Sequence, residues 1–499
     1  MTGDGVLDLL LEANFGHRIA EDERDELEQY FVETDQWRRL FAGDIDVVYG
    51  AKGSGKSALY SLLVQKTDAL FDRGIILIPG ENPSGAAAFS ELVPEPPTSE
   101  PEFIGLWKTY FLTLLALILK DWKVETDSAK AVYAALEDAK LLKRGASLQA
   151  LLKGVRTYVQ RVKSVEGGVL IDPSTSMPYA ITGKILIGEP DEKQAAAGFQ
   201  SVDHLLGEAN AAFKELKLGA WIILDRLDVA FETNEYLEKH ALRALFKAYL
   251  DMGALDMIGI KIFLRSDIWD RITEEGFREA SHITRSLIIE WNEQSLRHLV
   301  LRRILKNDPI AAFYGVDPET VFSRVDEQGK LMGRMLPDQI DAGRNPKTFA
   351  WMVGRTTDGN KQPVPRELIH LISATREAQV KRLEMGTEAP PDGELFERAA
   401  FKEALREVST VRLRQTLYAE YSDLKPYIEK LEGEKAEQLP ATLADTWGVP
   451  MEDAIKVAEQ LVRVGFFERT GDRESVSYWV PFLYRDALNL VQGQAKPTP

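Results

Sequence analysis

The 499-residue sequence contains no cysteine, and its six histidines show no spacing typical of metal ligands. The absence of cysteine excludes disulfides, thiolate zinc sites, iron–sulfur clusters and cysteine nucleophiles. Long apolar runs are also absent, because the longest, residues 109–119, is too short to cross a bilayer. The acidic N-terminal region has no basic stretch followed by an apolar one, as a secretory signal would. We therefore expect a cytoplasmic protein that has no membrane partner.

Basic residues are outnumbered by acidic ones, since the chain has 61 Lys and Arg and 78 Asp and Glu, which gives a formal net charge of −17. An acidic total disfavours non-specific binding to duplex DNA. Hydrophobic residues make up 44% of the chain, which excludes a protein that is disordered throughout. Residues 140–163 differ from this average because they contain seven basic residues and no acid. These cations either cover solvated helix faces, which is the commoner case, or contact nucleic-acid phosphates.

Residues 50–57 read Gly-Ala-Lys-Gly-Ser-Gly-Lys-Ser and match the phosphate-binding pattern G-x-x-x-x-G-K-[ST] in full. An apolar, strand-like run at 45–49 precedes the motif, and a helical pattern over 56–71 follows it. In such a loop the backbone N–H groups surround the phosphates, Lys56 reaches the β- and γ-phosphates, and the Ser57 hydroxyl ligates Mg²⁺. The sequence therefore predicts that ATP and Mg²⁺ bind here. The predicted nucleotide-binding residues are Gly50, Ala51, Lys52, Gly53, Ser54, Gly55, Lys56, Ser57 and Ala58.

A second apolar run, residues 219–224, ends at Asp225, where a carboxylate can hold Mg²⁺ together with Ser57. Asp228 follows three residues later, and there it can orient or deprotonate the water that attacks the γ-phosphate. The alternative is that Asp228 caps the next helix. Because Asp225 is far from Lys56 in the chain, we expect an insertion between the two halves of this site.

Strand-like and helix-like segments alternate on both sides of the expected insertion, which predicts an α/β fold with a parallel sheet. Within the insertion we expect a hydrophobic helix at 103–122 and a hairpin of 168–172 with 180–187. The predicted division is an acidic N-terminal helical segment (1–43), a P-loop core (44–85 and 203–292), a mostly helical insertion (86–202), a helical lid (293–410), a winged-helix domain (411–492) and a frayed tail (493–499).

Three segments together resemble the STAND and KAP-like, AAA+-related ATPases of the type found in bacterial anti-phage defence islands. They are the phosphate loop, Leu-Asp-Arg-Leu-Asp at 224–228, and Lys-Ile-Phe-Leu-Arg-Ser-Asp at 261–267. The resemblance implies an ASCE/AAA+-like core that hydrolyses ATP, with Arg265 as a sensor of the γ-phosphate. Residues 365–369, Pro-Arg-Glu-Leu-Ile, are similar to the lid-domain arginine motif of origin-recognition-type AAA+ proteins, which implies a second sensor at Arg366.

Both arginines have an alternative role that the sequence leaves open. Arg265 can instead pair with Asp267 or Asp228, and Arg366 can be a surface charge at the start of a helix. If the sensing roles hold, the predicted catalytic group consists of Asp228, Lys56, Arg265 and Arg366.

Two functions of different classes follow from these features. The first is an ATP-driven molecular switch, and the resemblance implies that it serves defence with a separately encoded protein effector, since no effector motif occurs in this chain. The second is a DNA-binding AAA+-type remodeller or loader that uses residues 140–163, and a homo-oligomer is compatible with either. The predicted helix at 451–464 carries a net acidic set of charges, which favours a protein contact over entry into a DNA groove.

Overall fold

The computed structural model describes residues 3–17, 23, 27–31, 34–80, 99–142, 150–151, 153–159, 184–196, 198–227, 235–274, 276–387, 389–391, 393–471 and 475–496. They form two compact units, which we describe separately. We call Glu33–Gly50 with Lys56–Ile289 the sheet unit. We call Met1–Val32, Ala51–Gly55 and Glu290–Pro499 the helical unit.

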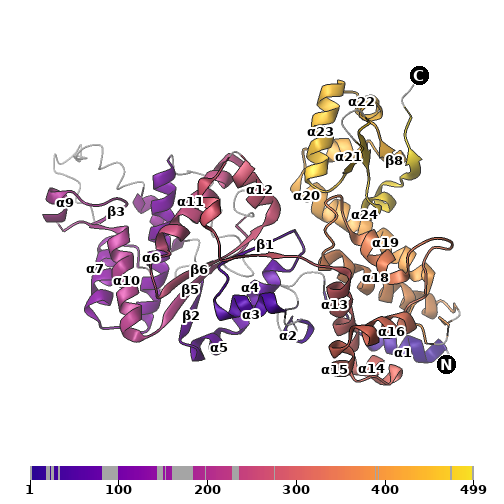
Figure 1. Cartoon of the computed structure of the whole chain (residues 1–499), viewed down its shortest axis with the longest axis horizontal. Helices are drawn as coiled ribbons and strands as arrows, with labels where there is room; N and C mark the ends of the chain where they lie inside the picture. The colour runs from indigo at the N-terminus through magenta and orange to yellow at the C-terminus, as the bar shows by residue number, and fades with distance from the viewer. Residues whose placement is uncertain are drawn as a thin grey trace. The chain divides into compact units, whose positions relative to one another are not determined.

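In the described part of the sheet unit, five parallel strands form one sheet in the order β2-β5-β6-β1-β7 (Figure 1). All four residues of β1 are buried, as expected for a parallel sheet that is covered on both faces. The predicted parallel α/β sheet is therefore confirmed. Its strands are β1 (Val47–Gly50), β2 (Ile75–Pro79), β5 (Gly219–Leu224), β6 (Ile258–Arg265) and β7 (Ser286–Ile289).

The helix predicted over 56–71 is interrupted. The Thr67 hydroxyl donates a hydrogen bond to the Val64 carbonyl at 2.6 Å, and a side chain that binds the backbone in this way competes with the helical ladder. The chain therefore leaves one helix at residue 65 and begins the next at Thr67. Helices near these strands are α3 (Asp35–Ala42), α4 (Lys56–Gln65), α5 (Thr67–Asp72), α12 (Ser266–Glu274) and the 3₁₀ helix η3 (Arg278–His282).

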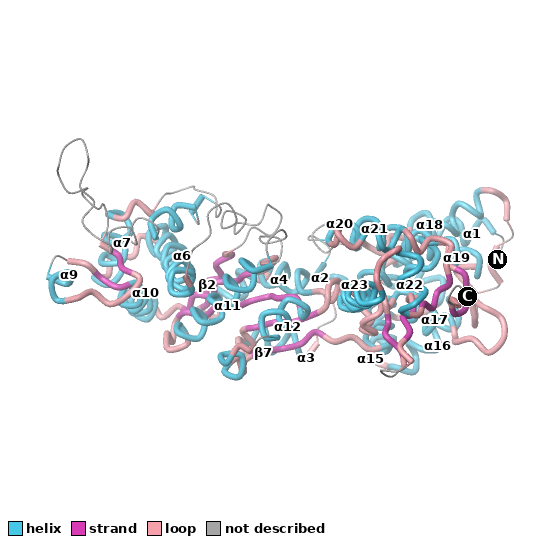
Figure 2. Tube along the Cα trace, turned by 90° about the horizontal axis from the view of Figure 1, so that it is seen from above, coloured by secondary structure: helices cyan, strands magenta, loops and turns pink. Residues whose placement is uncertain are grey.

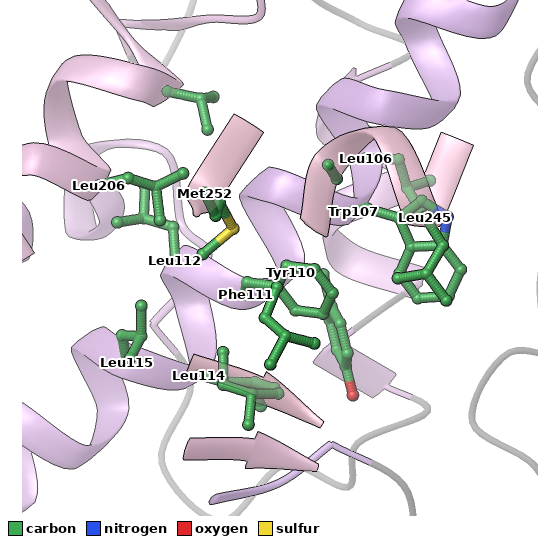
Figure 3. Packing of buried hydrophobic residues seen from close by; sticks show 14 of the residues in the cluster. Leu106, Trp107, Tyr110, Phe111, Leu112, Leu114, Leu115, Leu206, Leu245 and Met252 are labelled. Atoms are coloured by element: carbon green, nitrogen blue, oxygen red, sulfur yellow. The ribbon is translucent and has the colours of Figure 1, made fainter. Parts of the chain in front are cut away.

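The expected insertion (86–202) contributes two long helices to the core of the sheet unit, α6 (Glu100–Asp121) and α7 (Asp127–Asp138). Its short helix α9 (Glu192–Ala196) has no buried residue. The helices α10 (Val202–Leu216) and α11 (Glu235–Met252), which lie almost entirely in the predicted P-loop core, pack against α6 in the same cluster (Figure 3). Among the described residues α6 alone is long and apolar enough to cross a membrane, but 83% of its most apolar window is buried inside the protein. The Trp107 indole on α6 donates to the Ala241 carbonyl on α11 at 2.9 Å, so this buried indole N–H has its hydrogen-bond partner on the neighbouring helix.

The hairpin predicted inside the insertion is only partly within the described residues, since 168–172 and 180–183 lie outside them. The described remainder forms β3 (Ile185–Leu186), which pairs in parallel with β4 (Gln200–Ser201). A parallel partner from outside the predicted hairpin therefore occupies one side of this strand, which the local turn pattern could not indicate.

The described helical unit consists mostly of helices, and its strands are confined to the C-terminal part (Figure 2). The N-terminal α1 (Gly3–Glu12) packs on α18, where the Arg376 guanidinium donates to the Leu10 carbonyl at 2.7 Å. The other helices before the C-terminal part are α2 (Leu27–Tyr30), α13 (Glu293–Leu305), α14 (Asp308–Tyr314), α15 (Pro318–Ser323), α16 (Val325–Met335), α17 (Thr348–Thr356), α18 (Pro365–Glu384) and α19 (Arg398–Val411).

The C-terminal part contains a four-stranded sheet in the order β11-β8-β10-β9. The sequence alone also predicts a helix over 435–447, and the first half of this prediction is wrong. Lys435–Gln438 forms β8, and the chain is extended before Pro440, as a proline requires. Fraying from residue 493 is also wrong, since β11 continues to Gln494 and pairs with β8. The elements are η4 (Arg412–Leu417), α20 (Tyr418–Glu420), α21 (Lys425–Glu429), β8 (Lys435–Gln438), α22 (Pro440–Trp447), α23 (Met451–Arg463), β9 (Glu468–Thr470), β10 (Ser477–Trp479), α24 (Phe482–Arg485), η5 (Asp486–Leu488) and β11 (Val491–Gln494).

Candidate nucleotide-binding site

The phosphate-binding motif joins β1 to α4, so a strand precedes it and a helix follows it. Gly53 and Gly55 have φ values of 84° and 102°, which side chains rarely tolerate, and this accounts for glycine at both positions. The Lys56 ammonium donates a hydrogen bond to the Gly50 carbonyl at 2.9 Å. The lysine therefore folds back toward the strand end of its own loop, where it can meet phosphate oxygens.

Asp225 follows directly after β5 and is buried, with 5% of its surface exposed. Gly50 ends β1, and in a parallel sheet the carboxyl ends of all strands share one edge. The two residues therefore stand at the same edge, with β6 between their strands. Ser57 lies in the first turn of α4. A hydroxyl and a single carboxylate suit Mg²⁺, which usually keeps several waters and takes its remaining ligands from nucleotide phosphates.

Arg265 ends β6 and is the register partner of Gly50, so the predicted sensor stands beside the first residue of the loop. It pairs in bidentate fashion with Asp267, with Nε–Oδ1 and Nη2–Oδ2 distances of 3.0 and 2.8 Å. Pairing with Asp267 was one of the two alternatives to sensing, and the structure shows this pair, whereas the sensing role stays a prediction.

Asp267 is a residue of this region that the sequence reasoning assigned no functional role. Burial raises the pKa of its carboxyl, but attraction and hydrogen bonds from Arg265, with smaller attractions from Arg271 and Lys56, lower it more. The pKa therefore lies below its ordinary value, and the group stays an anion. An acid that acts on both Arg265 and Lys56 links the predicted sensor to the loop lysine, and its place two residues after the strand end was the available signal.

Arg226, the residue after Asp225, has a φ of 56°, which lies in the left-handed region. For a residue with a side chain this conformation is uncommon and is found preferentially near functional sites. Asp228, the predicted water-orienting carboxylate, lies outside the described residues, so both of its alternatives remain predictions.

Residues 51–55 of the loop belong to the helical unit by their contacts. The Trp291 indole donates to the Ser54 carbonyl at 2.8 Å, and Lys52 forms an ion pair with Glu420. A Cβ added to Gly53 would lie 3.0 Å from the Cβ of Arg366, so this arginine stands directly against the loop backbone. Sequence reasoning missed Trp291, because nothing local marks a tryptophan as a partner of a loop far away in the chain.

The Ser54 side chain gives a further indication of a ligand. Only 1% of the residue is exposed, and its hydroxyl has no hydrogen-bond partner among the described residues. A buried hydroxyl without a partner costs free energy, and a polar ligand in the loop can supply the missing bond.

The five-stranded parallel sheet and the motif that joins β1 to α4 together form an α/β P-loop core. No family model matches the sequence, and no curated protein matches it. A Walker-type ATPase of Pyrococcus abyssi is similar over 92% of this chain and 96% of its own, with 11% identity and a TM-score of 0.39. The ORC2 protein of Aeropyrum pernix, solved as ADPNP–ADP complexes, is similar over 94% of this chain and 92% of its own, with 12% identity and a TM-score of 0.38. With TM-scores this low, neither similarity by itself establishes the fold or the activity of this chain.

The basic segment at 140–163 is only partly described, since Lys143, Arg144, Arg161 and Lys163 lie outside the described residues. Lys140 and Lys153 are exposed, whereas Arg156 is 7% exposed and therefore buried. Arg156, one of the seven basic residues, therefore lies in the interior of the sheet unit and not on a surface that could contact phosphates.

Proposed function

We propose that this chain binds ATP with Mg²⁺, hydrolyses it, and uses the cycle as a molecular switch. The observation that carries the proposal is the complete phosphate-binding motif between β1 and α4, with the Lys56 ammonium folded onto the loop at Gly50. Ser57 and Asp225 would hold the metal ion, which would neutralise charge on the β- and γ-phosphates. The unpartnered Ser54 hydroxyl would donate to a phosphate oxygen.

In this proposal each remaining predicted residue has one task. Asp228 orients the attacking water, and Arg265, held by Asp267, meets the γ-phosphate from the strand beside the loop. Arg366, whose Cβ stands against Gly53 of the loop, meets the same phosphate. ADP lacks this group, so contacts to it can distinguish the two nucleotides, and a ligand shifts a conformational equilibrium only through such differential contacts.

The contacts of residues 51–55 support the switch. Loop atoms that would move on nucleotide binding touch Trp291, which stands just before α13, and Arg366 at the start of α18. We further propose that residues 411–492 form a winged helix, which the element order helix, strand, two helices and two strands supports.

We propose that a separately encoded protein effector docks on the C-terminal part, as the motif resemblance to defence ATPases implies. Met451 and Ile455 lie one turn apart on α23 and are 46% and 39% exposed, and the acids Glu452 and Asp453 lie between them in the sequence. An acidic surface with exposed apolar residues suits a protein partner better than a DNA groove. The DNA-binding remodeller remains the alternative, and DNA-stimulated turnover that falls steeply with salt would favour it.

The central test is isothermal calorimetry of ATP–Mg²⁺ binding to Lys56→Ala. Removing the charge that meets the β- and γ-phosphates should lower the affinity for ATP at least tenfold, about 1.4 kcal/mol or more, while the fold stays intact. Lys66→Ala is the matched control, because Lys66 follows the last turn of the same helix. Unchanged ATP binding by Lys56→Ala would refute the proposed site.

A further inference from the structure

A buried ionic cluster surrounds the start of α18, the helix that carries Arg366. Its centre is Arg412, the first residue of the π-helical turn η4, and 7% of this residue is exposed. Its guanidinium donates to Glu367 Oε1 at 3.0 Å, to Asp358 Oδ2 at 3.3 Å, and more weakly to the Tyr484 hydroxyl at 3.4 Å. We call these four residues the Arg412 cluster. One arginine thus joins two acids that are separated in the chain.

The two acids stand at the ends of the connection between α17 and α18. Glu367 is the next residue after Arg366, and Asp358 lies just after the end of α17. Arg412 therefore holds both ends of the segment that places Arg366 against the Gly53 backbone. Loss of the arginine would leave that segment attached only through its backbone and through contacts with other parts of the unit.

The same segment is also held by the C-terminal part of the helical unit. The Gly359 amide donates to the Gly465 carbonyl at 2.8 Å, and Lys361 pairs with Glu468 at 2.6 Å. A Cβ at Gly359 would lie 2.2 Å from the Phe467 carbonyl oxygen, so the two backbones are in close contact. Tyr484 adds a side chain from α24 to the cluster itself. The position of Arg366 therefore depends on residues that follow β8.

The residue types in the cluster indicate that it fixes the orientation of neighbouring segments more than it stabilises the fold. Burying ions costs free energy, and well-packed apolar residues of similar volume are often as stable or more so. Here one acid oxygen, Oε2 of Glu367, is buried with no hydrogen-bond partner among the described residues. What a planar guanidinium adds is fixed geometry, because its fork holds two acids at once, whereas a lysine is a point charge.

We propose that Arg412 is a positioning residue that holds Arg366 at the phosphate loop and makes its placement depend on the C-terminal part. This inference rests on the proposed function, because it takes the γ-phosphate as the group that Arg366 meets. A partner bound to the C-terminal part could then change nucleotide preference through the Arg412 cluster without touching the loop.

The charge of Asp358 supports this proposal. Burial raises the pKa of its carboxyl to about 6, although Arg412 and the Asn360 amide oppose the rise and Glu367 adds to it. The groups that face it are Arg412 from η4, Glu367 from α18, Tyr484 from α24 and Asn360 from its own loop. Below pH 6 the carboxyl becomes protonated and its attraction for Arg412 is lost, so the hold on Arg366 should weaken.

The test compares the affinities for ATP and ADP, measured by calorimetry with Mg²⁺ at pH 7.5, in the full-length parent and in Arg412→Lys. The variant keeps a positive charge but cannot bridge both acids. We expect its preference for ATP over ADP to fall by about tenfold, the loss of roughly one charge-assisted hydrogen bond, with ADP affinity unchanged. Arg303→Lys is the matched control, because Arg303 is also buried in the helical unit and forms a bidentate pair with Glu23.

Each outcome decides the proposal. If the parent shows no preference for ATP, the proposed function and this inference both fail. If the parent prefers ATP and Arg412→Lys does so equally, or if Arg303→Lys loses as much, the positioning role alone is wrong. Should Arg412→Lys not fold, the isosteric Glu367→Gln replaces it with the same expectation. Finally, the ATP preference of the parent should decline below pH 6, whereas that of Asp358→Asn should stay constant across this range. If the preference of Asp358→Asn declines below pH 6 as that of the parent does, the coupling through Asp358 is wrong.

Discussion

Both units of the chain bury a cation, Lys261 in the sheet unit and Arg412 in the helical unit, and the two sites differ in what they hold together. Lys261 is 1% exposed and donates to the Ile45 carbonyl at 2.6 Å and to Asp46 Oδ1 at 2.8 Å. Arg412 instead bridges two acids from separate elements. Lys261 therefore ties β6 to the residues just before β1. Arg412 links η4 to α18, to α24 and to the segment after α17.

The pKa values of the two buried cations are shifted in opposite directions. Burial lowers the pKa of Lys261, and although Asp46 opposes this, the pKa stays below its ordinary value. Burial also lowers the pKa of Arg412, but Tyr484, Glu367 and Asp358 raise it above its ordinary value. Lys261 is thus incompletely compensated, whereas Arg412 has more negative partners than it needs. The charged form of Lys261 is therefore less favourable in the folded chain than in the unfolded one, whereas the charge on Arg412 is favoured by two acids and depends on both of them.

The largest effect should follow from Arg412→Met. The variant leaves Asp358 and Glu367 buried without their counter-ion, and removing one partner of a buried pair costs about 3–5 kcal/mol. The free energy of unfolding, measured by urea denaturation at pH 7.5, should fall by this amount. A loss below about 1 kcal/mol would mean that the two acids find other partners or water, and the contrast between the two sites would disappear.

Asp358→Asn should raise the free energy of unfolding, and the size of this gain should depend on pH. The folded pKa of about 6 exceeds the ordinary 3.8, so the contribution of this carboxyl to stability is present at low pH and is lost as pH rises between these values. At pH 7 the variant should therefore be more stable than the parent by up to about 3 kcal/mol, and near pH 4 the two should be equal. Thermal unfolding across this range measures the difference, and a constant difference would contradict the raised pKa.

The phosphate loop and the strand β8 show what the sequence could and could not predict. The strand β1, its loop and the end of β5 at Asp225 were predicted, because a motif and an apolar run are local signals. The strand β8 was missed, because Lys-Ala-Glu-Gln has little strand propensity and only its pairing with β10 and β11 makes it extended.

The residues that surround Lys261 and Arg412 come from distant parts of the chain, so no local sequence pattern indicates that they lie together. Arg366 was singled out by its motif, but its placement against Gly53 depends on Arg412, and nothing in the neighbourhood of residue 412 indicates such a role. The same holds for the contact of Trp291 with Ser54. Chemistry carried by a short motif can be inferred from sequence, whereas the residues that position it become visible only when the chain is folded.

Lys261→Met tests the other side of the comparison and should cost less than Arg412→Met, about 1–3 kcal/mol. The Ile45 carbonyl loses its donor, but Asp46 keeps Arg285, whose Nε lies 2.8 Å from its Oδ2, and the Tyr249 hydroxyl at 3.1 Å. Urea denaturation under the same conditions gives the comparison directly. If Lys261→Met proves the more costly of the two, the lysine holds more of the fold together than its contacts indicate.

The smallest effect concerns the backbone beside Lys261. Gly43 has a φ of 93°, and an added Cβ would lie 2.8 Å from the Trp221 ring, the ring on which the Lys261 ammonium rests at 4.3 Å. Gly43→Ala should therefore destabilise the protein through both backbone strain and displacement of the indole, by about 1–2 kcal/mol. Gly315→Ala is the matched control, because Gly315 also has a positive φ, of 62°, but an added Cβ there meets nothing within 4 Å. Thermal unfolding should show the larger loss in Gly43→Ala, and equal losses would mean that the indole moves freely and does not hold the lysine in place.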